Sequence, residues 1–122
     1  MDKRKQGLEW CKQVANFLRL EGHTVDGPFS KVIFTKGRKM ASHVDIGGCY
    51  DLISFKDGTL HLHQVTAINM KSNKIKKMRK LGVIGLLWCY CILRNTKKPG
   101  FRRFVVSPGS NLEVWETSSI II

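Results

Sequence analysis

The stretch YDLISFKDGTLHLHQVTA, residues 50–67, constrains the fold more than any other part of the chain. Two apolar-rich runs flank the Asp-Gly pair at residues 57–58, and such a pair between two runs strongly favours a β-hairpin. Residues two apart in a strand lie on the same face, so Gln64 and Thr66 project together while Val65 packs behind them. The hairpin also brings Asp51, at the start of its first strand, close to these side chains.

Three further segments predict two helices and a buried strand around this hairpin. Residues 5–21 place apolar side chains at helical spacing. Residues 69–81, NMKSNKIKKMRKL, predict a basic helix with Ser72 or Asn73 as its N-cap. Residues 83–94, VIGLLWCYCILR, form a continuous apolar run that is typical of a central strand buried on both faces. The apolar stripe of the first helix consists of Leu8, Cys11, Val14, Ala15 and Leu18.

The remaining segments complete an α/β pattern. A short strand is expected at residues 31–35, followed by a basic turn, GRK, at residues 37–39. After the buried strand, FRRFVVS and LEVWET read as one or two more strands. The order is therefore a helix, three strands, a basic helix, and two or three strands. We expect one domain, residues 1–122, with a mixed central β-sheet flanked by helices.

The charge balance of the chain indicates a polyanionic partner. Its 122 residues contain 21 Lys and Arg against 9 Asp and Glu, which gives a net charge of +12. The cations cluster along the sequence, and a clustered excess on a small domain is typical of a nucleic-acid binder. The residues expected to hold nucleic acid are Lys71, Lys74, Lys76, Lys77, Arg79, Lys80, Lys97, Lys98, Arg102 and Arg103.

The sequence also favours an intracellular, cytoplasmic protein without a membrane partner. No apolar run approaches the roughly 20 residues that span a bilayer. The first ten residues, MDKRKQGLEW, are charged and lack the apolar core of a signal peptide. The four cysteines show no CxxC spacing, so we expect buried free thiols rather than a zinc site or disulfides.

An aspartate that begins one strand and a polar-x-polar pair that ends the next resemble the PD-(D/E)XK nuclease superfamily. The likeness is closest to the archaeal-type Holliday junction resolvases and covers residues 3 to about 95. That family uses a glutamate on the first helix, an aspartate at a strand start and an E-x-K pair on the next strand. The resemblance implies a restriction-endonuclease-like core in which Glu9 and Asp51 take the first two positions. Gln64-Val65-Thr66 then falls where the family has E-x-K.

The resemblance further implies a site for Mg²⁺ or Mn²⁺, which the chain's two departures weaken. Asp51, an amide oxygen of Gln64 and the backbone carbonyl of Val65 are the expected ligands, because these ions prefer hard oxygen donors. Gln64 supplies oxygen without the charge of a glutamate, and Thr66 cannot supply the ammonium of the family's lysine. Lys71 or Lys74, at the start of the basic helix, are candidates to reach back and replace that lysine.

The function expected from these features is that of a metal-dependent endodeoxyribonuclease acting on branched DNA, specifically a Holliday junction resolvase. A two-fold junction calls for a homodimer, and the apolar C-terminal SSIII with Trp115 offers a surface for one. The alternative for this end is a last strand folded onto its own sheet. The runner-up function is a non-catalytic DNA-binding relative of the nuclease fold. An RNA-binding or nucleoprotein accessory module is a third possibility.

Three alternatives concern individual site residues. Asp45 competes with Asp51 for the metal, because HVDIGGCYD contains both aspartates. His61 and His63 share the strand face opposite Gln64; spacing of two can bind zinc, although a covered or exposed histidine pair is the simpler interpretation. His43 precedes the expected site and is a candidate for a phosphate contact.

Overall fold

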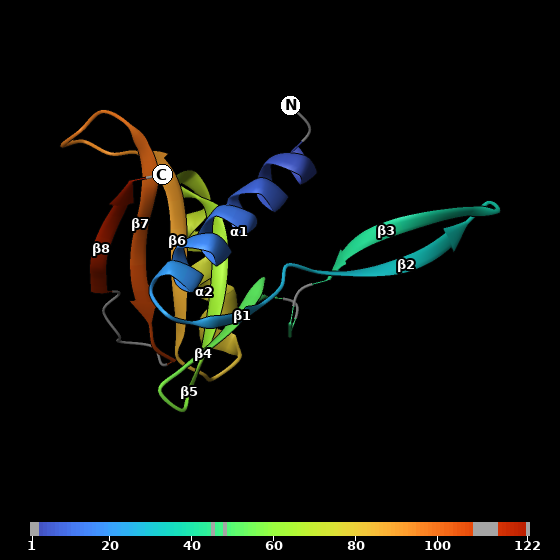
Figure 1. The fold of residues 1–122 in the computed structure, drawn as a ribbon, viewed down its shortest axis with the longest axis horizontal. Helices are drawn as coiled ribbons and strands as arrows, with labels where there is room; N and C mark the ends of the chain where they lie inside the picture. The colour runs from blue at the N-terminus through green and yellow to red at the C-terminus, as the bar shows by residue number, and fades with distance from the viewer. Residues whose placement is uncertain (1–2, 45, 48, 109–114, 122) are drawn as a thin grey trace.

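The computed structural model describes residues 3–44, 46–47, 49–108 and 115–121 of the chain. Within these residues the chain forms an α/β fold with a six-stranded mixed sheet, strand order β1-β4-β5-β6-β7-β8, and a separate two-stranded ribbon, β2-β3 (Figure 1). The elements are α1 (Lys3–Leu20), β1 (Thr24–Asp26), β2 (Phe29–Thr35), β3 (Arg38–Val44), β4 (Leu52–Lys56), β5 (Thr59–Ala67), η1 (Ile68–Met70), α2 (Lys71–Lys80), β6 (Gly85–Ile92), β7 (Pro99–Val106) and β8 (Trp115–Ile121). The expected α/β class, with a mixed sheet flanked by helices, is confirmed.

The β4–β5 hairpin forms where the sequence places it. The two strands pair antiparallel, with Leu52 opposite His63 and Lys56 opposite Thr59. Asp57 and Gly58 form the turn with φ angles of 53° and 74°. Two consecutive positive φ angles characterise the tight turns whose twist matches that of a hairpin, which is why Asp-Gly is favoured there.

The crossover from β5 to β6 makes the sheet mixed. These two strands run parallel, with Gln64 opposite Leu87 and Thr66 opposite Cys89. A parallel pair requires a long connection, and η1 and α2 provide it. Every other pair of neighbouring strands in the sheet is antiparallel.

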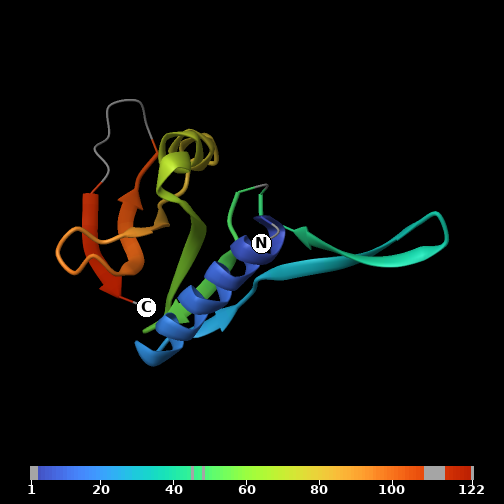
Figure 2. The same ribbon diagram turned by 90° about the horizontal axis from the view of Figure 1, so that it is seen from above.

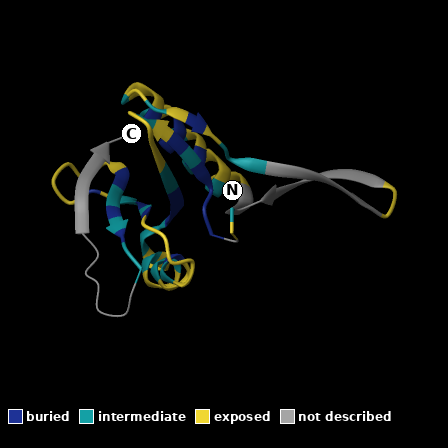
Figure 3. Cartoon of the chain, turned by 90° about the horizontal axis from the view of Figure 1, so that it is seen from below, coloured by how far each residue is buried: buried dark blue, intermediate teal, exposed yellow. Residues whose placement is uncertain are grey.

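The two helices α1 and α2 lie on opposite sides of the sheet (Figure 2), and buried residues line the sheet between them (Figure 3). Each face of the sheet buries its own hydrophobic cluster. Under α1, Cys11, Val14, Ala15 and Leu18 pack with strand residues that include Leu52, Val65, Trp88 and Phe101. Under α2, Met78 packs with Cys49, Tyr50, Leu87, Cys89, Phe104 and Val106. Successive residues of β6 belong to different clusters, because side chains alternate along a strand. β6 is therefore the central strand, covered on both faces, that its apolar sequence predicts.

The β2–β3 ribbon matches the sequence prediction only in part. It extends away from the body of the molecule (Figure 1), and its turn lies at Lys36 and Gly37. The expected basic turn at residues 37–39 was wrong in its extent, since Arg38 and Lys39 already belong to β3. The sequence of β3 contains Met, Ala and Ser, which have little strand preference. β1, with three residues, is too short for a periodic pattern, so five strands rather than three precede α2.

Two details of the helices differ from the prediction. Leu8 is 39% exposed, so the buried stripe of α1 begins one turn later, at Cys11. The N-cap of α2 is Met70, without a side-chain cap hydrogen bond. Because η1 leads directly into α2, Ser72 and Asn73 lie inside the helix rather than at its cap.

The cysteines are buried thiols as expected, and the C-terminal segment follows the second of its two expected arrangements. Cys11, Cys49 and Cys89 are buried and Cys91 is half-buried, in agreement with the expected buried thiols. Residues 115–121 form β8, which pairs antiparallel with β7. The apolar end of the chain thus folds onto its own sheet, the alternative to a surface left over for a partner. Among the described residues, no helix is both long and apolar enough to span a membrane.

Candidate functional site

Asp51 lies at the entrance of β4 on the α2 side of the sheet. Its backbone N–H donates to the carbonyl of His63 at 2.8 Å, which extends the hairpin pairing by one residue. Leu52 packs under α1, so strand alternation turns Asp51 to the opposite face, the same face as Gln64. Asp51 is only 5% exposed. Its Oδ2 accepts hydrogen bonds from the Val65 backbone N–H at 2.9 Å and from Gln64 Nε2 at 3.0 Å.

Gly27, which lies outside the sheet, packs closely against the backbone of Asp51. It has a φ of 110°, and a Cβ atom built on it would lie 2.6 Å from the Asp51 carbonyl oxygen. No side chain fits so close to a backbone oxygen, and L residues rarely adopt this φ. A glycine is therefore required where the chain enters β2, because it packs directly against the residue that carries the carboxylate.

Gln64 and Thr66 project from the same face of β5, as expected, but the amide of Gln64 is turned the other way. Its Nε2 donates both to Asp51 Oδ2, at 3.0 Å, and to the Val65 carbonyl, at 3.1 Å. Its Oε1 is buried without a hydrogen-bond partner among the described residues. The two other expected metal ligands, Asp51 Oδ2 and the Val65 carbonyl, thus both accept from Gln64 Nε2. This nitrogen occupies the place that a bound cation would take.

The donor chemistry of this point fits a hydrated hard cation. The orphaned Gln64 Oε1 is the observation that supports the fit, since half a turn about the terminal side-chain torsion exchanges it with Nε2. Three oxygens of the described residues would then face one point, and among them only the Asp51 carboxylate carries a full charge. Within the described ranges no group of three or more His, Cys, Asp or Glu is placed to hold a metal. The residues therefore suit an ion that keeps several waters, as Mg²⁺ does.

Two of the expected helper residues, Glu9 and Lys71, do not lie with Asp51 and Gln64. Glu9 is exposed on α1, the helix that covers the opposite face of the sheet from Gln64. Lys71 Nζ lies 4.2 Å from the centroid of the Phe104 ring. Phe104 is opposite Leu87, which is opposite Gln64, so Lys71 extends over β7, two strands away from β5. Lys71 therefore does not bring its ammonium group to Thr66, which is 7% exposed. Lys74 is half-buried on α2.

The expected nucleic-acid contacts divide between the two faces. Lys76, Lys77 and Lys80 are exposed on α2, and Lys97 and Lys98 are exposed in the β6–β7 loop. Arg102 and Arg103 lie within β7, in the strand that the run FRRFVVS predicts. Strand alternation separates them: the Arg102 guanidinium lies 5.2 Å from the Phe104 ring centroid on the α2 side. Arg103 lies 5.0 Å from the Trp88 ring centroid on the α1 side. Lys74 and Arg79 are half-buried.

The α1 side of the sheet holds a buried polar chain that sequence reasoning missed. Trp88 Nε1 donates to His63 Nδ1 at 3.0 Å, His63 Nε2 lies 2.7 Å from Ser54 Oγ, and Ser54 Oγ lies 2.9 Å from His23 Nδ1. His63 and Ser54 are fully buried. Burial, reinforced by His61, His23 and Arg103, lowers the pKa of His63 to about 3. Ser54, a polar residue in the apolar run DLISF, was the available pointer to this chain.

The sequence-level alternatives are resolved in part. His61 and His63 do lie opposite Gln64 and Thr66, and His63 is a hydrogen-bonded core residue rather than an exposed ligand. Asp45 lies outside the described residues. Comparisons with protein-family models, curated proteins and solved structures find no match to this chain.

Proposed function

We propose that this protein is a metal-dependent endodeoxyribonuclease acting on branched DNA, with a restriction-endonuclease-like core and the role of a Holliday junction resolvase. One observation carries the proposal. The buried Asp51 carboxylate and the Val65 carbonyl converge on one point beside Gln64. That point lies at the end of the strand that leads into the basic helix α2. A buried carboxylate beside a backbone oxygen, below a cationic surface, is suited to phosphodiester chemistry.

The exposed lysines of α2 supply the means of holding DNA. Lys76, Lys77 and Lys80 stand on the helix that covers the Asp51 side of the sheet, and Lys97 and Lys98 add charge from the β6–β7 loop. Lysines contact phosphates without reading bases, so they suit a protein that recognises DNA shape rather than sequence. Phosphate contacts release condensed counterions, which makes such binding strongly dependent on salt.

Asp51, the Val65 carbonyl and Gln64 Oε1, after its half turn, would hold Mg²⁺ or Mn²⁺. Such an ion lowers the pKa of a bound water and offsets the negative charge that grows on a phosphodiester. The chain's own contribution is to hold the Asp51 carboxylate in place, through the Val65 N–H and the close packing of Gly27. Because Thr66 offers no ammonium, we expect slower hydrolysis than a lysine at that position would give.

A second candidate function is favoured by the amide of Gln64. Nε2 already satisfies both Asp51 Oδ2 and the Val65 carbonyl, so the acceptors are paired without any ion. A chain that keeps this arrangement when bound to DNA is a non-catalytic binder of branched DNA. The two candidates share the basic helix and differ only in whether Gln64 turns.

One assay separates them. Labelled four-way junction, duplex, single-stranded DNA and RNA are incubated with the protein in Mg²⁺, in Mn²⁺ or in EDTA. Paired cuts in the junction that require a divalent ion support the nuclease. Tight junction binding without cuts in either ion supports the non-catalytic binder. A preference for RNA over every DNA substrate would overturn both proposals.

The homodimer remains a proposal that rests on the two-fold symmetry of a four-way junction. The C-terminal segment no longer supports it, since residues 115–121 pair with β7 of the same chain. Light scattering at micromolar concentrations tests the point. A mass equal to one chain of 13.9 kDa, both alone and on the junction, would overturn the dimer.

A further inference from the structure

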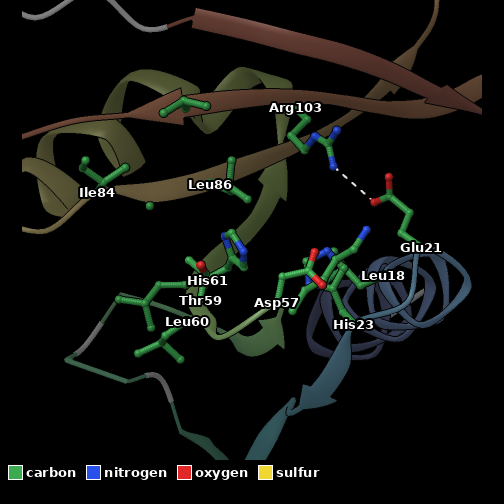
Figure 4. Close-up of a pocket in the computed structure, with 14 residues that line it drawn as sticks. Leu18, Glu21, His23, Asp57, Thr59, Leu60, His61, Ile84, Leu86 and Arg103 are labelled. Atoms are coloured by element: carbon green, nitrogen blue, oxygen red, sulfur yellow. Dashed lines mark hydrogen bonds and ion pairs between the residues drawn. The ribbon is translucent and has the colours of Figure 1, made fainter.

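A pocket of about 770 Å³ opens on the α1 side of the sheet, away from Asp51 (Figure 4). It lies where the C-terminal end of α1 meets the β4–β5 turn and the ends of β6 and β7. Leu60, Ile84 and Leu86 provide apolar lining, and the polar lining includes His23, His61, Lys56, Glu21 and Arg103. This volume is within the usual range for small-molecule sites, which are mostly apolar with a few well-placed polar groups.

The buried polar chain fixes which hydrogen-bonding group His23 presents to this pocket. The indole N–H of Trp88 can only donate, so His63 Nδ1 accepts and neutral His63 carries its proton on Nε2. His63 Nε2 then donates to Ser54 Oγ, and we assign the Ser54 hydroxyl proton to its other hydrogen-bond contact, His23 Nδ1. With this assignment the remaining ring nitrogen of His23, Nε2, carries the proton. His23 therefore offers the pocket a donor with a locked tautomer, and its pKa is lowered by burial and by His61.

Arg103 is positioned as the second donor of the pocket. Its Nη1 lies 3.3 Å from Glu21 Oε1, and this ion pair is only partly exposed. The guanidinium also stacks over the Trp88 ring at 5.0 Å. Contacts on two sides hold the long side chain in one geometry, which reduces the entropy lost when it binds an anion. Figure 4 shows Arg103 and Glu21 paired at the edge of the pocket, with His23 and His61 nearby.

Ser54 is a positioning residue rather than a nucleophile. It is fully buried, and its hydroxyl is held between two histidine nitrogens. No substrate atom can reach it without unpacking the sheet. The chain of hydrogen bonds thus has one exit to solvent, at His23, and its effect is to orient that ring toward the pocket.

We propose that this pocket binds a nucleotide, with its phosphate held by His23 Nε2–H, Arg103 and Lys56, and its base against Leu60, Ile84 and Leu86. A phosphate matches two fixed donors and a lysine. A planar base matches an apolar wall flanked by the His61 ring, since bases stack on aromatic side chains. The kind of ligand rests on the proposed nucleic-acid function, whereas the pocket geometry is independent of Asp51. The ligand is a free nucleotide or the terminal nucleotide of a strand.

The experiment is an NMR titration of the protein labelled with ¹⁵N at histidine. The probes are dAMP, deoxyadenosine, inorganic phosphate, and an oligonucleotide with a 5′-phosphate or a 5′-hydroxyl. We expect dAMP to shift the His23 and His61 signals, with deoxyadenosine and phosphate each at least about tenfold weaker. Stronger binding of the phosphorylated oligonucleotide than of dAMP identifies a strand end, and the reverse order identifies a free nucleotide. Equal responses to phosphate and dAMP, or none at His23, overturn the proposal.

The adjacent arginines of β7 provide a matched pair of variants. Arg103→Gln removes the positioned donor and should weaken dAMP at least about tenfold. Arg102→Gln makes the same chemical change on the opposite face of the sheet and should leave dAMP binding unaltered. Equal effects of the two would overturn the role of the pocket. Should Arg103→Gln fail to fold, Lys56→Gln removes the lysine proposed to hold the phosphate and should weaken dAMP binding several-fold.

Ser54→Ala tests the locked tautomer. With the hydroxyl removed, His23 populates both tautomers, so its two nitrogen shifts move toward averaged values and dAMP binds several-fold more weakly. Unchanged nitrogen shifts would overturn the orientation of His23. Asp51→Asn serves as the separating control: it removes the proposed hydrolysis and should leave the dAMP titration as in the wild type. Failure of one proposal can thus be told from failure of the other.

Discussion

The two faces of the sheet treat their buried polar side chains differently. Under α1, the groups from Trp88 to His23 form a chain in which each hydrogen bond has a donor and an acceptor. Under α2, Gln64 Oε1 and the Tyr50 hydroxyl are buried without a hydrogen-bond partner among the described residues. A buried unpaired polar atom costs roughly 1–3 kcal/mol. Gln13 Oε1 on α1 is also buried without a hydrogen-bond partner among the described residues. The contrast is therefore between the connected chain, which positions the His23 ring, and the unpaired Gln64 Oε1, where a further ligand would gain most.

Loss of the Asp51 charge should produce the largest effect on the α2 face. Asp51→Asn removes the full negative charge that Asp51 supplies at the metal point, so cleavage should fall by roughly a thousandfold or more. Junction binding should stay equal or become tighter, because a carboxylate that repels phosphate is gone. Cleavage of labelled junction in Mg²⁺ and a binding titration in EDTA measure the two effects. Unaltered cleavage would show that the chemistry lies elsewhere.

Lowering the pH should reduce the free energy of unfolding through His63 on the α1 face. The pKa of His63 is lowered from 6.5 to about 3. Between these two pH values His63 is therefore protonated in the unfolded chain and neutral in the folded chain. Stability is therefore full above pH 6.5 and falls by about 1.4 kcal/mol per pH unit toward about pH 3. Denaturant unfolding from pH 7 to pH 3 measures this slope. His63→Gln should remove that part of the slope, and identical slopes in both proteins would contradict the assignment.

Crowding the Asp51 backbone should destabilise the fold without changing a polar side chain. Gly27→Ala places a Cβ 2.6 Å from the Asp51 carbonyl oxygen at a φ of 110°, so we expect a loss of about 3 kcal/mol. The control is Gly7→Ala in α1, where an added Cβ meets nothing within 4 Å. That change should stabilise the helix by about 0.5–1 kcal/mol. Thermal unfolding compares the two variants, and equal effects would show that the close approach of Gly27 to Asp51 is unimportant for stability.

Gln64→Glu tests whether the unpaired oxygen of Gln64 is part of a metal site. Without metal, a second carboxylate replaces the amide donor beside Asp51 and should destabilise the fold by about 2 kcal/mol. Mg²⁺ should restore this stability, because a ligand that binds only the folded state raises it, and cleavage should need less Mg²⁺. Gln6→Glu on the exposed side of α1 is the control for charge alone. A destabilisation that Mg²⁺ does not reverse would favour the non-catalytic binder.

The smallest expected effect is on the salt dependence of DNA binding, which tests which face of the sheet binds DNA. Replacing Lys76, Lys77 and Lys80 of α2 by Ala should weaken binding to all sequences alike. The slope of log affinity against log salt should flatten by about 0.9 for each duplex phosphate that the variant no longer neutralises. Lys5→Ala with Lys12→Ala, exposed on α1, should leave the slope unchanged. An unchanged slope in the α2 variant would remove this helix from the interface.

The sequence by itself determined the elements whose signals are local. The Asp-Gly turn, the alternation of β5 and the apolar run of β6 each predict their structure from neighbouring residues, because strand and turn conformations depend on nearby sterics. The same alternation is enough to place Gln64 beside Asp51. Prediction failed where the pattern was weak, as in β1, which has three residues, and in β3.

Only the tertiary structure decided how the polar groups are paired. Whether Gln64 presents oxygen or nitrogen to Asp51 depends on the Val65 carbonyl, and the direction of the α1-side chain of hydrogen bonds depends on Trp88. His23 and Ser54 lie 31 residues apart in sequence, and no periodicity relates them. Lys71 turns to Phe104 because β7 lies within reach of the start of α2. Hydrogen bonds and ring contacts are short-ranged in space but not in sequence, so they appear only once the strands are side by side.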